Sequence, residues 1–281
     1  MRLVLDTGCI RNLIHRSEPQ IDFELLVSAG SSIASSIAEP ALVELLTSIH
    51  EQRVVWDEWR VAASSLDRIL DADLPFLPGR RQLAELVTEQ LSNDEIQHIR
   101  AGWRHIVESE TAEQLRCVSS YLDSSGNERH LRADLDTAQE IRTRIHQDWI
   151  DFIRHMQEIL GGQQMPNPRI EAIVRQGFEP ISGVPLDSVD AAVRFLARFV
   201  VLSVNGREPY NPESNPSDSL DFELLYALAL PQSVICTTDQ RLMNITGATG
   251  SPQASRIIGV PDLNRRLGEG SLTELVRTSS M

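Results

Sequence analysis

Four acidic residues stand where an α/β fold would bring them together: Asp6, Glu44, Asp221 and Asp239. Asp6 and Asp239 each follow a short apolar run that predicts a buried parallel strand. Ligands of open α/β sheets collect at the carboxyl ends of the strands. Four carboxylates gathered there would repel one another strongly unless a divalent cation neutralises them. All-oxygen ligands select Mg²⁺ or Mn²⁺, and such ions can activate a water and stabilise the leaving oxygen in phosphodiester hydrolysis.

Two threonines could support this chemistry. Thr237 and Thr7 each lie beside a predicted strand end and could place a hydroxyl on the same ion or on the attacking water. The second ligand has an alternative, because Glu39 lies near Glu44 and could take its place. The sequence does not identify the residues that bind the substrate.

The sequence predicts where the helix that carries Asp221 begins. Ser217 or Asp218 is expected to cap it, which places Asp221 in the first turn of a mostly buried helix. Asp218 is also a supporting candidate for the acidic cluster.

The elements that must position these residues form an α/β pattern. Strands are predicted at residues 3–5, 33–37, 234–236 and 257–260. Helices are predicted after Asp6, from Pro40, from 184 or 186 to about 204, from 217 or 218 to Pro231, and from 263 to 267. We therefore expect a parallel sheet with helices packed against it.

The middle of the chain, from about residue 55 to residue 177, has a different pattern. Apolar residues recur there at helical spacing, and the longest pattern extends from Leu131 to Ile159. We expect an α/β domain formed by residues 1–54 and 178–281, split by an α-helical insertion at 55–177. The insertion could be a lid, a substrate reader or a docking surface. Its long helix is expected to carry five arginines, either as a salt-bridged surface or as an RNA-tracking stripe: Arg129, Arg132, Arg142, Arg144 and Arg154.

Composition narrows the class of protein. The net charge of -14 argues against coating nucleic acid by bulk attraction. No apolar run predicts a membrane span and no signal-peptide pattern opens the chain, so we expect a cytoplasmic protein without membrane contact. Cys9, Cys117 and Cys236 are widely spaced, which favours reduced core residues over a disulfide framework or a zinc site.

A family resemblance is carried by four segments in this order: MRLVLDTGCI, IAEPALVELL, the helix with Asp221, and VICTTDQRL. They resemble the PIN-domain nucleases, a family of metal-dependent ribonucleases that includes bacterial toxin nucleases. RIIGVPDLNRRL is similar to the closing strand and helix of that family. The resemblance implies a PIN-like three-layer fold with a central mostly parallel sheet, plus the helical insertion. It also implies that Mg²⁺ or Mn²⁺ is held by Asp6, Glu44, Asp221 and Asp239.

Two functions remain open at this stage. The first is an endoribonuclease that cuts RNA, with a toxin or defence role, a partner or inhibitor protein and a homodimer all suggested by the resemblance. The second is a PIN-like interaction protein with weak or absent catalysis, which docks a partner through the insertion. Whether the substrate is RNA or DNA is also open.

Overall fold

The computed structural model describes residues 1–29, 32–116, 119–123, 125–131, 134–161, 165–178 and 183–278. Cys117, expected in the core, and Arg132, expected on the long helix, lie outside the described residues. In the part of the chain that is described, no helix is both long and apolar enough to span a membrane.

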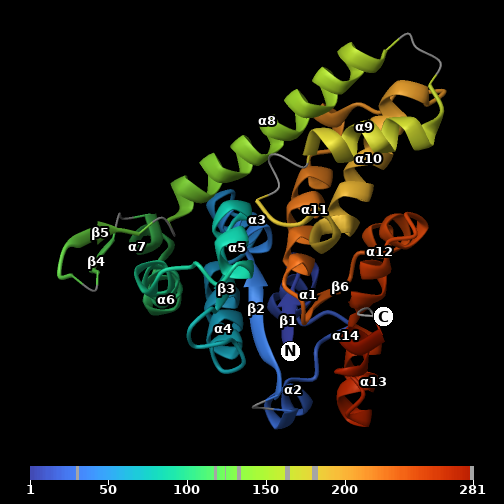
Figure 1. The fold of residues 1–281 in the computed structure, drawn as a ribbon. Coiled ribbons are helices and arrows are strands. Elements are labelled where there is room, and N and C mark those ends of the chain that lie inside the picture. Colours follow the sequence, from blue (N-terminus) through green and yellow to red (C-terminus); the bar gives the residue numbers. More distant parts are fainter. Residues whose placement is uncertain are drawn as a thin grey trace.

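Five parallel strands form the central sheet. They are β1 (Arg2–Leu5), β2 (Ala34–Ala38), β3 (Phe76–Leu77), β6 (Ser233–Thr237) and β7 (Ile257–Gly259). Their order across the sheet is β3–β2–β1–β6–β7, so β1 is the middle strand (Figure 1). Leu5 pairs with Ile37 on one side and with Cys236 on the other. The predicted α/β class with a parallel sheet is confirmed.

Helices make up most of the remaining chain. Before the long helix they are α1 (Thr7–Ile14), α2 (Phe23–Ala29), α3 (Glu39–His50), α4 (Trp56–Asp67), α5 (Arg80–Val87), α6 (Asn93–Glu108) and α7 (Ala112–Arg116). From there on they are α8 (Leu135–Leu160), α9 (Asn167–Phe178), α10 (Asp190–Asn205), α11 (Ser217–Leu225), α12 (Gln240–Ala248), α13 (Val260–Glu269) and α14 (Glu274–Thr278). Short 3₁₀ turns are η3 (Leu186–Val189), η4 (Pro212–Ser214), η5 (Tyr226–Ala229) and η6 (Pro252–Arg256).

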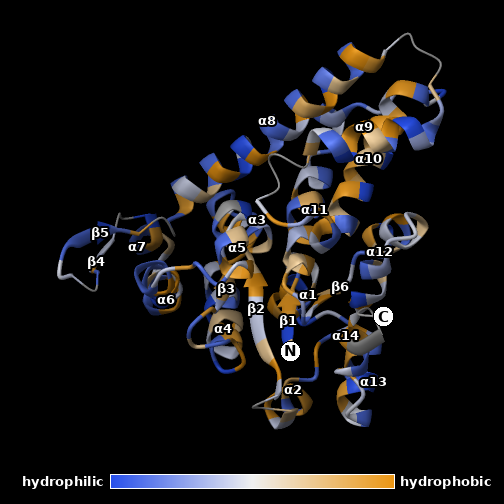
Figure 2. Ribbon diagram, in the orientation of Figure 1, coloured by the Kyte–Doolittle hydropathy of each residue, from blue (hydrophilic) through white to orange (hydrophobic). Residues whose placement is uncertain are grey.

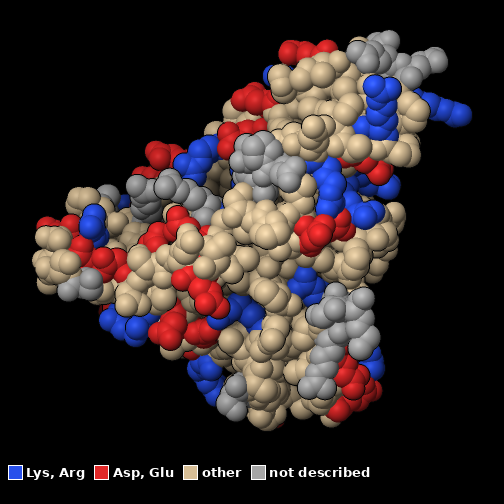
Figure 3. Space-filling view, viewed as in Figure 1, with Lys and Arg blue, Asp and Glu red and all other residues tan. Residues whose placement is uncertain are grey.

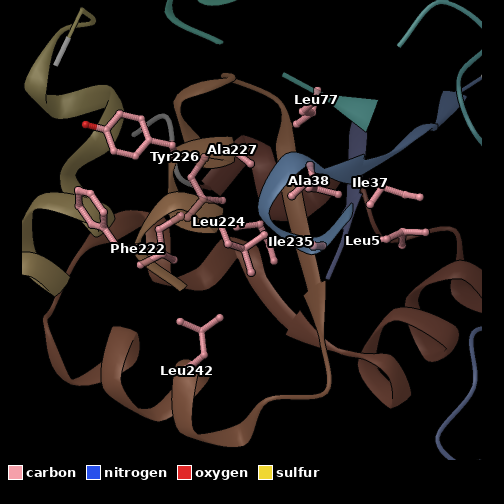
Figure 4. Packing of buried hydrophobic residues seen from close by; sticks show 14 of the residues in the cluster. Leu5, Ile37, Ala38, Leu77, Phe222, Leu224, Tyr226, Ala227, Ile235 and Leu242 are labelled. Carbon is pink, nitrogen blue, oxygen red and sulfur yellow. The ribbon is translucent and has the colours of Figure 1, made fainter. Parts of the chain in front are cut away.

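The core is built where strands and helices meet. Leu5, Ile37 and Ile235 come from three adjacent strands and are fully buried. Phe222 and Tyr226 add aromatic rings from α11 and η5 (Figure 4). Parallel strands buried on both faces usually have near-continuous apolar sequence, whereas β2 buries two serines as well.

The long helix α8 runs diagonally along one side of the molecule and packs against α3, α10 and α11 (Figure 1). Hydrophobic and hydrophilic residues alternate along it, as expected for an amphipathic helix (Figure 2). It begins at Leu135 rather than near Leu131, because the Asp134 carboxylate caps it by accepting the Thr137 N–H at 2.7 Å.

The segment predicted as a helical insertion also contains strands. β3 lies within it and pairs with β2, so this part of the segment belongs to the central sheet. An antiparallel hairpin of β4 (Ser120–Leu122) and β5 (Glu128–His130) forms a second, separate sheet. The prediction that Arg129 lies on the long helix is wrong, because Arg129 is in β5 and pairs with Asp123 at 2.9 Å.

Charged side chains of both signs are interspersed on the face seen in Figure 3. On α8, Arg142 pairs with Glu51 at 3.6 Å, and Arg154 pairs with Glu213. These contacts favour the salt-bridged surface over an RNA-tracking stripe.

Candidate active site

Asp6 lies where β1 ends and α1 begins. Its Oδ1 accepts the Thr7 N–H at 2.6 Å, and its Oδ2 accepts the Thr237 hydroxyl proton at 2.6 Å. Burial raises the pKa of Asp6 to about 6; the two hydrogen bonds oppose this rise, and the charges of Glu44 and Asp239 add to it. The carboxylate is therefore fixed in place while it feels the field of its acidic neighbours.

Thr237 and Asp239 lie at the carboxyl end of β6, next to Asp6 at the end of β1. The Thr237 oxygen accepts the N–H of Asp239 at 2.9 Å, so this buried hydroxyl links two of the predicted acids. Asp239 caps α12, with Oδ1 accepting the Leu242 N–H at 2.9 Å. The hydroxyl of Thr237 is committed to Asp6, which makes Thr237 a positioning residue.

Asp221 lies in an environment that disfavours its charged form. Its Oδ2 is buried and has no hydrogen-bond partner among the described residues; the nearest cation, Arg241 Nη1, lies 3.9 Å away. Burial raises the pKa of Asp221 to about 8, and the charges of Asp6 and Asp239 contribute further. A bound cation would relieve this repulsion.

Asp218 has a different role from Asp221. The predicted cap was wrong, because α11 begins at Ser217 after Pro216, which puts Asp218 in the first turn and Asp221 in the second. Asp218 is fully buried and accepts hydrogen bonds from the Tyr210 hydroxyl at 2.8 Å and from Arg241 Nη1 at 2.5 Å. Its oxygens are thus satisfied, and it holds Arg241 near the acidic cluster.

The two candidates for the second ligand point in different directions. Glu44 accepts a hydrogen bond from Arg11 Nη2 at 3.0 Å, and Arg11 also donates to the Ser48 hydroxyl at 3.1 Å. Glu39 begins the same helix but lines a separate cavity that also contains Arg80. Five residues correspond to about 500° of helix rotation, so the two side chains leave α3 on different faces.

One cavity of about 370 Å³ collects the acidic residues. All four predicted ligands line it, together with three residues of particular interest: Thr7, Arg11 and Thr238. Gly8 also borders it, and a Cβ at Gly8 would lie 2.0 Å from the Thr238 hydroxyl oxygen. Because Gly8 has no side chain, Thr238, which directly follows β6, can pack closely against the start of α1.

Sequence reasoning did not single out Arg11, Gly8 or Thr238 as site residues. The position of Arg11 on the polar side of an otherwise apolar helix start was the available signal, but its partner Glu44 is 33 residues away. Within the described ranges, no three His, Cys, Asp or Glu side chains form a ready-made set of metal ligands. Glu44 Oε1 accepts its hydrogen bond from Arg11, so the Arg11 guanidinium lies beside one of the four acids.

Comparisons with protein-family models, with curated proteins and with solved structures found no match for this chain. Function is therefore inferred from the geometry and chemistry of the site.

Proposed function

We propose that this protein is a Mg²⁺- or Mn²⁺-dependent endoribonuclease with a PIN-like three-layer fold. The observation that carries the proposal is that acids from four separate elements line one cavity at the carboxyl edge of a parallel sheet. An acid with a structural role, such as Asp71 paired with Arg2 at 2.8 Å, has a lowered pKa. Asp6 and Asp221 instead have raised pKa values, and such perturbed groups concentrate at functional sites.

The donor set fits a hard divalent cation. Carboxylate oxygens are the ligands that Mg²⁺ and Mn²⁺ prefer, and Asp221 Oδ2 is a buried oxygen to which no described residue donates a hydrogen bond. When bound, such a cation supplies the positive charge that activates a water and stabilises the leaving oxygen of a phosphodiester. Zinc is disfavoured, because Cys9 and Cys236 do not line this cavity.

The chain's own residues prepare the site. Thr237 fixes Asp6, and the cap of α12 fixes Asp239, so two acids are held before any ligand arrives. Arg11 lines the same cavity and contacts Glu44. Its guanidinium would bind a phosphate oxygen of the RNA, which provides a local attraction that the net charge of -14 does not.

The test is cleavage of single-stranded and folded RNAs by the full chain with Mn²⁺, with Mg²⁺ or with EDTA. Asp6→Asn and Glu44→Gln are compared with two matched controls on exposed helix surfaces, Asp57→Asn and Glu171→Gln. We expect metal-dependent cutting by the intact chain and by both controls, with a loss of at least about a hundredfold in the two site variants. Circular dichroism checks that all variants fold, and a DNA of the same sequence decides whether the substrate is RNA or DNA.

A second readout separates metal binding from catalysis. Mn²⁺ should raise the melting temperature of the intact chain by mass action and should have a much smaller effect on the site variants. Stabilisation by Mn²⁺ without cutting would favour the PIN-like interaction protein. Cutting that both site variants retain would overturn the proposed four-carboxylate site.

A further inference from the structure

A second cavity lies on the other side of α3 from the carboxylate site. It measures about 610 Å³ and opens between α8 and the elements α3, α5, α6 and α11. None of the four acids of the candidate active site lines it. It is therefore a separate feature that the proposed nuclease does not use.

The wall of this cavity carries an excess of negative charge. Two arginines, Arg80 and Arg144, face five carboxylates: Glu39, Glu95, Glu140, Asp148 and Glu223. Arg80 is already engaged, because its Nη2 lies 3.6 Å from Glu223 and its guanidinium lies 5.6 Å from the centre of the Tyr226 ring. The charge of Arg144 opposes the raised pKa values of both Glu39 and Glu223. The cavity wall therefore carries more carboxylates than guanidinium groups.

Glu39 lies at a fixed position in the cavity wall. Its carboxylate accepts the N–H of Gly79, and it lies so close that a Cβ at Gly79 would be 2.2 Å from Glu39 Oε2. Burial raises the pKa of Glu39 to about 7, with the charge of Glu223 adding to it and that of Arg144 opposing it. The charged form of this carboxylate is disfavoured, and a cation bound beside it would offset that cost.

Part of the wall is apolar. Ile99 from α6 faces Ile141 and Ile145 from α8, with Phe76 and Leu91 nearby. A recess of about 160 Å³ adjoins this cavity at Arg80, and its lining includes the Trp149 and Phe152 side chains. Binding sites for small molecules combine such apolar walls with a few placed charges.

We propose that this cavity binds a small organic cation, an amine or amidinium group joined to an apolar body. The cationic group pairs with Glu39, and the body packs against the isoleucines of α6 and α8. Nucleic acid does not fit, because its phosphates would meet the carboxylates at the cavity wall.

Benzamidine is a suitable probe, and benzamide is its neutral match in shape. Binding of each to the full chain is measured by calorimetry at pH 8 in EDTA. We expect benzamidine to bind and benzamide to bind at least about tenfold more weakly. Glu39→Gln and the cavity-filling Ile141→Trp should each weaken benzamidine binding by at least about tenfold, whereas Glu171→Gln should leave it unchanged.

Glu44→Gln locates the binding site. If benzamidine binds in the cavity that contains Glu39, this variant keeps full benzamidine binding, because Glu44 lines the cavity of the candidate active site. Loss of binding in Glu44→Gln would place the probe at the four acids and overturn the proposal. Equal binding of benzamide, or full binding by Glu39→Gln and Ile141→Trp, would also overturn it. None of these outcomes depends on nuclease activity.

Discussion

The Thr237 hydroxyl donates a hydrogen bond of 2.6 Å to Asp6 Oδ2, joining the ends of two neighbouring strands. The same oxygen accepts the Asp239 N–H, so one buried threonine sets the positions of two acids. This link holds the carboxylates that follow β1 and β6 at the same edge of the sheet.

Replacing this threonine should raise the pKa of Asp6. Thr237→Val keeps the shape of the side chain but removes its hydrogen bond to Asp6. That hydrogen bond lowers the pKa of Asp6, whereas burial raises it. We expect a pKa above the present value of about 6, a loss of roughly 1 kcal/mol of stability, and weaker Mn²⁺ binding at pH 7. Carbon-detected NMR titration of the Asp6 carboxyl measures the shift. Thr246→Val is the control, since the buried Thr246 hydroxyl bonds a backbone carbonyl; an equal shift there would contradict the assignment.

The metal-free protein should become less stable as the pH rises from about 6.5 to about 8.5. The pKa values of Glu39 and Asp221, about 7 and about 8, are raised above their unfolded values, so the folded state holds these protons more tightly. Their stabilising contribution is complete below the unfolded pKa values, falls as the pH rises from these toward the folded values, and is lost above the folded values. His105 and His146 have lowered pKa values and act in the opposite direction only below this window. Urea unfolding in EDTA measures the trend, and a flat or rising stability would contradict it.

Asp221→Asn should stabilise the protein while abolishing RNA cleavage. The substitution removes a buried charge whose Oδ2 lacks a hydrogen-bond donor, so at pH 8 in EDTA we expect a gain of about 2 kcal/mol. Thermal and urea unfolding give the stability, and the cleavage assay gives the function. Asp57→Asn, an exposed change of the same type, should do neither. A less stable Asp221→Asn protein would show that the acid has an unseen structural partner.

Arg11→Gln should tighten Mn²⁺ binding and weaken RNA cleavage. Arg11 holds Glu44 at 3.0 Å, and its loss frees that acid for a metal ion. We expect roughly five- to tenfold tighter Mn²⁺ binding by calorimetry, together with a higher KM for RNA. Arg60→Gln, on an exposed face of α4, serves as the control. Unchanged Mn²⁺ affinity in Arg11→Gln would remove Arg11 from the site.

Gly8→Ala should destabilise the protein, although alanine is the better helix former. Local propensity alone predicts a gain of roughly 0.5–1 kcal/mol in α1. The new Cβ would however lie 2.0 Å from the Thr238 hydroxyl oxygen, and relieving this clash should cost about 1–3 kcal/mol. The double variant Gly8→Ala with Thr238→Ala should recover most of the loss in a thermal melt. A stable single variant would show that the Thr238 side chain can simply rotate away.

The sequence predicted the elements that carry local signals. Short apolar runs before Asp6 and Asp239 are sufficient to predict both buried strands and the positions of both acids at their ends. β3 was missed because it has only two residues, Phe76 and Leu77, between two prolines. Such a strand exists only because β2 is beside it, and pairing between distant segments leaves no local pattern.

The sequence indicated which acids would lie near one another, but not which other side chains would contact them. The acids Asp6, Glu44, Asp221 and Asp239 line one cavity as expected from their order and context. Glu44 lines this cavity and Glu39 lines the other one because packing decides which face of α3 meets α1. The pairing of Arg11 with Glu44 likewise joins two helices whose relative placement no single segment encodes.

The contact between Asp6 and Thr237 spans 231 positions of the chain, and this separation matters during protein synthesis. A nascent chain carries Asp6 and Glu44 long before the ribosome has added Asp221 and Asp239. β1 can pair with β2 early, but its other edge stays open until β6 emerges. The acidic cavity can therefore form only after Asp239 has left the ribosome, when β6 becomes available to pair with β1.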